Sequence, residues 1–108
     1  CMYLNTRSKD IDVAQNFKII EWLKTELLDA VADLFKSLIK TGNDTKNDAL
    51  ASIIIITYLL GRRVGVSFSN LDRTVKDKLN VSIKEAREVE RWYNDLFELS
   101  NYLENKKR

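Results

Sequence analysis

The first third of the chain carries a hydrophobic stripe with the spacing of a helix. Its apolar residues recur at intervals of three or four, and no helix breaker interrupts them before Gly42. This pattern predicts one long amphipathic helix over about residues 12–40. The stripe consists of Val13, Phe17, Ile20, Leu23, Leu27, Val31, Leu34 and Leu38.

The next segment, residues 48–63, is hydrophobic on every side. Only Ser52 and Thr57 interrupt its apolar run before Gly61. Four consecutive isoleucines, residues 53–56, favour a strand by propensity, whereas the length of the segment without proline favours a helix. We therefore predict a helix over about 46–63 that is buried at the centre of the fold, with a strand over the isoleucines as the alternative.

Two further helices are predicted in the second half of the chain. The first covers about residues 69–79 and ends at Asn80, and the second covers about 82–105. Ser82 and Glu85 have the spacing of a capping box, which would open this last helix. Residues 1–10 and 106–108 are polar, and we expect them to be loosely ordered.

Composition favours a single all-α domain. The chain of 108 residues has no proline and only three glycines, which leaves few of the turns that an all-β fold needs. The four predicted helices indicate a four-helix bundle-like domain. Because a chain of this size builds only a modest core, we expect self-association, as a homodimer or higher homo-oligomer, to complete it.

The charge balance argues against a nucleic-acid partner. The chain has 18 basic and 16 acidic side chains, a formal net charge of +2. A helix-turn-helix over residues 50–79 is an alternative, but Asp72 and Asp77 on the would-be reading helix count against it. No signal peptide or membrane-spanning segment is evident, so we expect a cytoplasmic protein without a membrane partner.

Several kinds of active site are excluded by residue type. The chain has no histidine, so catalysis by an imidazole group and metal binding by an imidazole group are both ruled out. Cys1 is the only cysteine, which excludes a zinc cluster and an internal disulfide. No phosphate-binding or dinucleotide-binding glycine motif is present. What remains is carboxylate chemistry, with Mg²⁺ or Mn²⁺ as the cation that oxygen ligands suit.

One group of carboxylates has a suitable spacing for such a site. Glu26, Asp29 and Asp33 lie at i, i+3 and i+7, so they project from one flank of the apolar face of the first helix. Carboxylates on a flank can face a groove between helices, where helical bundles build metal sites. The alternative is an ordinary solvated surface, which is the commoner arrangement of acidic residues on helices.

The sequence also resembles the MazG-like proteins of the all-α nucleoside triphosphate pyrophosphatase superfamily, over about residues 17–80. The family motif is E-E-x-x-E on one helix and E-x-x-D on the next. The string TELLD at residues 25–29 is similar to the first part, with Glu26 and Asp29 on the second and third acidic positions and Thr25 in place of the first glutamate. The string LASIIIITYLL at residues 50–60 is similar to the second helix. In that register Ala49 and Ser52 occupy the acidic positions, and Asp48 is one residue out of register.

The resemblance implies a helical bundle that pairs with a second copy and holds Mg²⁺ with four carboxylates. The implied reaction is the attack of water on a nucleoside triphosphate, which releases pyrophosphate. This chain keeps two of the four expected acidic ligands, so we expect hydrolysis to be weak or lost. The candidate metal ligands are Glu26, Asp29, Asp33, Asp48 and Ser52.

Three basic residues are candidates for contacting the substrate. Arg62 and Arg63 end the central helix, where they either bind phosphate or complement the negative end of the helix dipole. Lys76 lies on the third predicted helix, where the resemblance implies basic residues that face the nucleotide. A non-catalytic, self-associating helical module that binds a nucleotide or a protein is the alternative function.

Overall fold

The computed structural model describes residues 2–86 and 93–106, with side chains from residue 12 onward in the first range and from residue 94 onward in the second. All regular structure in these ranges is helical, in the order α1 (Met2–Ser37), α2 (Asp44–Arg63), α3 (Phe68–Glu85) and α4 (Tyr93–Asn105). This confirms the all-α fold and shows that the four isoleucines are helical. The chain divides into two compact units, Cys1–Phe68 and Ser69–Arg108. That the two units form one domain stays a prediction.

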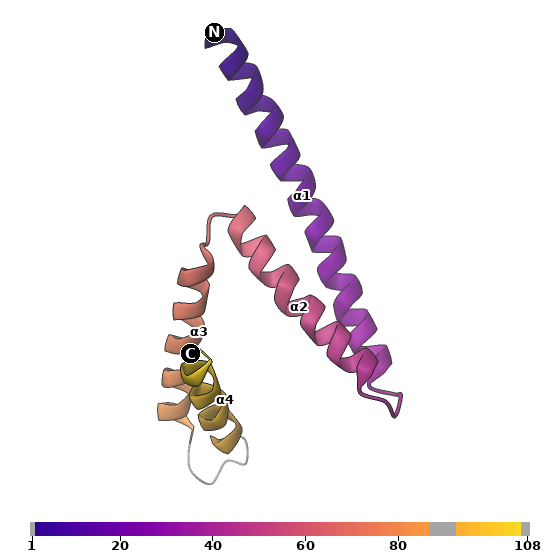
Figure 1. The fold of residues 1–108 in the computed structure, drawn as a ribbon, viewed down its shortest axis with the longest axis vertical. Helices are drawn as coiled ribbons and strands as arrows, with labels where there is room; N and C mark the ends of the chain where they lie inside the picture. The colour runs from indigo at the N-terminus through magenta and orange to yellow at the C-terminus, as the bar shows by residue number, and fades with distance from the viewer. Residues whose placement is uncertain (1, 87–92, 107–108) are drawn as a thin grey trace. The chain divides into compact units, whose positions relative to one another are not determined.

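The first unit is a hairpin of α1 packed on α2 (Figure 1). Leu23, Ala30 and Ser37 of α1 lie seven residues apart and are all buried, and Ala49 of α2 is buried as well. Three of these four side chains are small, which lets the two helices approach closely. The Ser37 hydroxyl donates a hydrogen bond of 2.7 Å to the Leu34 carbonyl, so its burial leaves no unpaired polar group.

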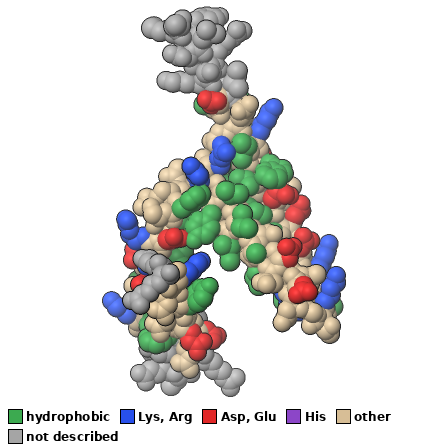
Figure 2. Space-filling model, viewed as in Figure 1, with side chains coloured by type: hydrophobic (Ala, Val, Ile, Leu, Met, Phe, Trp, Pro, Cys, Tyr) green, Lys and Arg blue, Asp and Glu red, His purple; other side chains and the backbone are tan. Residues whose placement is uncertain are grey.

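Much of the remaining apolar surface of this hairpin is open. Within α2, Ala49 is buried, whereas Ile54 and Ile55 are each 58% exposed. On the face of Figure 2, hydrophobic side chains gather over α1 and α2. Within this first unit, the prediction of a central helix buried on all sides was therefore wrong. Within this unit α2 packs along α1, and one neighbour covers only one side of a helix.

The helix boundaries differ from those predicted in both halves of the chain. α1 begins at Met2 rather than near Asp12 and ends at Ser37, and α2 begins two residues earlier than expected. The break predicted at Asn80 is absent, because asparagine is only mildly unfavourable inside a helix. Ser82 therefore lies within α3 and is not an N-cap. Residues 87–92 of the predicted helix 82–105, and the last two residues of the end expected to be loose, lie outside the described residues.

The turn after α2 has a defined glycine-dependent geometry. The Val66 amide donates to the Gly61 carbonyl at 2.8 Å, and the Gly65 amide donates to the Arg62 carbonyl at 3.2 Å. This pair of hydrogen bonds forms a Schellman motif, which needs a residue with positive φ after the helix. Gly65 meets this requirement with φ 97°.

In the second unit, α3 is amphipathic and buries Leu79. Lys76 of α3 forms an ion pair with Glu104 of α4 at 3.2 Å. No single helix among the described residues is both long and apolar enough to cross a membrane.

Candidate functional site

The candidate metal ligands of α1 differ in their exposure. Glu26 is half-buried beside the face that packs on α2, whereas Asp29 and Asp33 are exposed. On α2, Ser52 is half-buried and Asp48 is exposed. Their placement agrees with a flank of the α1–α2 contact, but not all of them line the same cavity.

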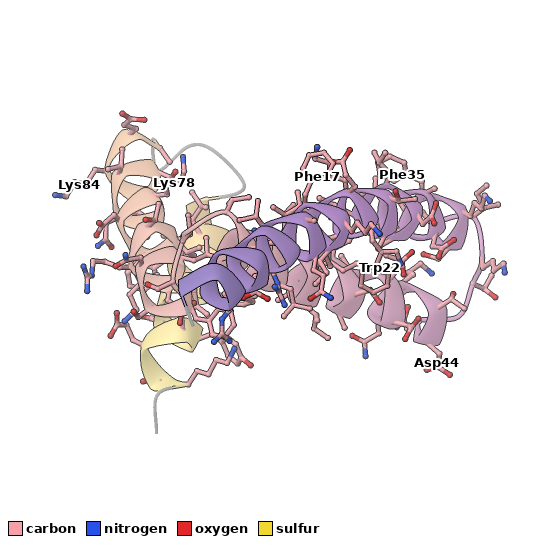
Figure 3. The ribbon with its side chains drawn as sticks, turned by 90° about the horizontal axis from the view of Figure 1, so that it is seen from above. Phe17, Trp22, Phe35, Asp44, Lys78 and Lys84 are labelled. Carbon is pink, nitrogen blue, oxygen red and sulfur yellow. The ribbon has the colours of Figure 1, made fainter. Side chains whose placement is uncertain are left out.

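A pocket of about 390 Å³ lies at the turn end of the hairpin and brings together two of the five candidates. Asp33 of α1 and Asp48 of α2 line it, and Glu26, Asp29 and Ser52 do not. Asp44, at the start of α2, is a third acidic residue of the lining (Figure 3). Two lysines, Lys36 and Lys40, also line the pocket and offset part of its negative charge.

Asp44 was not among the predicted site residues. In the sequence it reads as a residue of the first turn of a helix, where an acidic side chain complements the dipole. Only the fold of the turn at residues 38–43 brings it to the same pocket as Asp33. The sequence contains no spacing signal that relates the two.

Within the residues that the structure describes, no three His, Cys, Asp or Glu side chains lie close enough to share one metal ion. Ala49, to which the resemblance assigns an acidic position of the family motif, is 4% exposed and packs in the contact between α1 and α2. A methyl group at this position adds nothing to a ligand set. The roles of the five candidate metal ligands therefore stay predictions.

The opposite end of α2 forms a second, basic pocket of about 400 Å³. It is lined by Asn16 of α1 and by Leu59, Arg62 and Arg63 of α2. The Arg63 guanidinium donates to the Asn16 Oδ1 at 3.3 Å, and the Asn16 Nδ2 donates to the Arg63 carbonyl at 3.3 Å. The structure thus brings together the two arginines that were predicted to contact substrate. Asn16 was missed, because it reads as one polar residue among many in the first predicted helix.

Lys76 belongs to the chain's second unit, whereas these arginines belong to the first. Its side chain is 24% exposed and its ammonium group pairs with Glu104. A nucleotide would have to compete with this carboxylate for Lys76. Its role in substrate binding also stays a prediction.

Comparison with known proteins identifies the class to which this helical chain belongs. The model of the MazG-like family matches residues 13–96, which include α1, α2 and α3 from residue 13 onward. The chain therefore belongs to the MazG-like family, and its fold is of the nucleoside triphosphate pyrophosphatase type. Searches of curated proteins and of solved structures found no match.

Proposed function

We propose that the protein is a self-associating MazG-like protein in which Mg²⁺-dependent hydrolysis of a nucleoside triphosphate to the monophosphate and pyrophosphate is weak or lost. The observation that carries this proposal is the family match over residues 13–96, and it is supported by the burial of Ala49, to which the resemblance assigns an acidic position of the motif. The fold is kept, and part of the metal-binding chemistry is missing.

The carboxylates that remain support weak metal binding. Glu26 and Asp29 of α1 would be the main ligands of Mg²⁺ or Mn²⁺, with Asp33, Asp48 or the Ser52 hydroxyl as further oxygen donors. Mg²⁺ retains several waters and is commonly held by one or two carboxylates plus substrate phosphates. With fewer anionic ligands, the ion and the developing charge on the phosphoryl group are less well stabilised.

The exposed apolar surface of the hairpin supports self-association. Phe17, Leu28 and Phe35 of α1 are 63%, 72% and 62% exposed. Figure 3 shows Phe17 and Phe35 on the same side of α1. Monomeric proteins rarely expose several large apolar side chains next to one another, and a second copy of the same hairpin would cover them.

Measurement of pyrophosphate release tests the catalytic part of the proposal. The protein is incubated with each nucleoside triphosphate and Mg²⁺ or Mn²⁺, beside the Glu26→Gln variant. We expect slow release that depends on the added metal and falls about ten-fold or more in Glu26→Gln, because removal of a charged ligand weakens the metal site.

The matched control is Glu21→Gln, which removes the same charge from the same helix. Glu21 is exposed and pairs with Lys24 at 2.6 Å, three residues along the helix, so its loss should leave activity unchanged. Turnover that survives Glu26→Gln would contradict the assignment of Glu26 as a ligand.

A second candidate function is a non-catalytic helical module that binds a nucleotide or a protein. It is favoured by one observation, namely that no three potential metal ligands come together in the described part of the chain. This alternative predicts a stable oligomer by light scattering with no pyrophosphate release above that of a blank. Robust turnover would rule it out.

A further inference from the structure

The pocket at the carboxyl end of α2 differs from the one at the hairpin turn in the sign of its charge. Its four lining residues, Asn16, Leu59, Arg62 and Arg63, include two guanidinium groups and no carboxylate. Asn16 and Glu26 are ten residues apart on α1, which is about 15 Å along a helix. The basic pocket is therefore a separate surface from the candidate metal ligands.

Arg62 is held in place by an aromatic pair. Its guanidinium carbon lies 5.1 Å from the centre of the Phe68 ring. The Phe68 ring in turn meets the Tyr58 ring edge to face, with centroids 5.8 Å apart at an angle of 90°. A guanidinium stacked on an aromatic face keeps its N–H donors at its edge, where they can still bind an oxyanion.

Arg63 is held by a different device. Its guanidinium Nη1 donates to the Asn16 Oδ1, which directs the guanidinium toward α1, and the Asn16 Nδ2 donates in return to the backbone carbonyl of Arg63. Among the described residues neither Arg62 nor Arg63 has a carboxylate within ion-pair distance. Two neighbouring positive charges are thus oriented in advance and are not neutralised by a side chain in this part of the structure.

Complementation of the α2 dipole explains why basic residues occur here, but not why both are oriented. The dipole effect needs only a positive charge near the last turn and no particular direction of the side chain. A site that binds an oxyanion through two hydrogen bonds benefits from guanidinium groups that are already oriented, because their restraint lowers the entropy lost on binding. The Phe68 ring orients Arg62 in this way, and the Asn16 amide orients Arg63.

We propose that Asn16, Arg62 and Arg63 form a phosphate-binding site that works without a metal ion. Its ligand is the phosphate chain of a small molecule, either free inorganic phosphate or pyrophosphate, or the phosphates of a nucleotide. The nucleotide as ligand rests on the proposed function, whereas phosphate binding itself does not.

Calorimetric titration in the presence of a metal chelator tests this site. The ligands are inorganic phosphate, pyrophosphate, a nucleoside triphosphate and the corresponding nucleoside. We expect the phosphate-bearing ligands to bind and the nucleoside not to bind. Equal affinity for pyrophosphate and the triphosphate identifies phosphate alone as the ligand, and tighter binding of the triphosphate identifies a nucleotide.

Variants show whether the site is built from the named residues. We expect Arg62→Gln and Arg63→Gln each to weaken binding about ten-fold or more, which is the value of one hydrogen bond to a charged group. Arg62→Lys, which keeps the charge but not the planar fork, should also weaken it. Arg73→Gln removes an equal charge from an exposed position on α3 and should have no effect.

Two outcomes would overturn the proposal. One is unchanged binding in Arg62→Gln and Arg63→Gln, and the other is an equal loss in Arg73→Gln, which would indicate non-specific attraction. Because the titration needs neither metal nor turnover, its result is independent of the pyrophosphate assay. A protein without hydrolytic activity can still pass it.

Discussion

Two leucines of α1 show how differently the two sides of this helix are used. Leu23 is 2% exposed in the contact with α2, whereas Leu28, five residues later, is 72% exposed. Both belong to the same helix and have the same hydrophobicity. The comparison teaches that a hydrophobic residue on a helix is expected to be buried, but that the residue type does not show which surface buries it.

Residue size explains which side α2 takes. The covered side of α1 presents the small residues Ala30 and Ser37, and α2 contributes the small residue Ala49 to the contact. The two backbones can therefore come close. The open side presents large side chains such as Phe17 and Phe35. Large protruding side chains suit interdigitation with another surface of the same kind, in the manner of knobs and holes.

The largest expected effect comes from truncating the covered leucine. Leu23→Ala should lower the free energy of unfolding by about 3 kcal/mol, because it removes buried methyl groups and leaves a cavity. Leu28→Ala should change it by less than about 0.5 kcal/mol in the single chain. Urea unfolding at a protein concentration that favours the single chain measures both. Equal losses in the two variants would contradict the assignment of the covered side.

A smaller effect is expected on association when a charge is placed on the open side. Phe35→Lys should raise the concentration at which the oligomer dissociates by about ten-fold or more, because a lysine is poorly accommodated in an apolar contact. Sedimentation over a range of concentrations measures this midpoint.

Trp22→Lys is the control for that change. Trp22 is as exposed as Phe35, at 59% against 62%, but lies on another side of α1 (Figure 3). If Trp22→Lys dissociates the oligomer and Phe35→Lys does not, the proposed face is wrong.

The smallest expected effect is on the stability of the two turns that flank α2. The turn after α2 needs a glycine, whereas the turn before it does not. Gly65→Ala should destabilise the fold by about 1 kcal/mol, because its φ of 97° is unfavourable for a residue with a Cβ. Gly42→Ala should be close to neutral, since Gly42 lacks a positive φ and its Cβ would meet nothing within 4 Å. Thermal unfolding measures both, and a larger cost at Gly42 would contradict this account of the turns.

The candidate sites were predictable to different degrees. The arginine pair could be named from its position at the end of a helix, because that position is local information. Asn16, which holds Arg63 from 47 residues away, could not be named, since only the α1–α2 contact brings the two together. Asp44 was missed for the same reason.

By itself, the sequence determined that this protein is all-α, favoured a helix over a strand for residues 53–56, and limited the candidates for metal and phosphate chemistry to carboxylates, a serine hydroxyl and basic side chains. These follow from local periodicity, length and residue type. Tertiary structure decided which side of α1 is covered, which acidic residues share a pocket and how Arg62 and Arg63 are oriented. Such features depend on contacts between residues far apart in the chain, and helical spacing does not encode them.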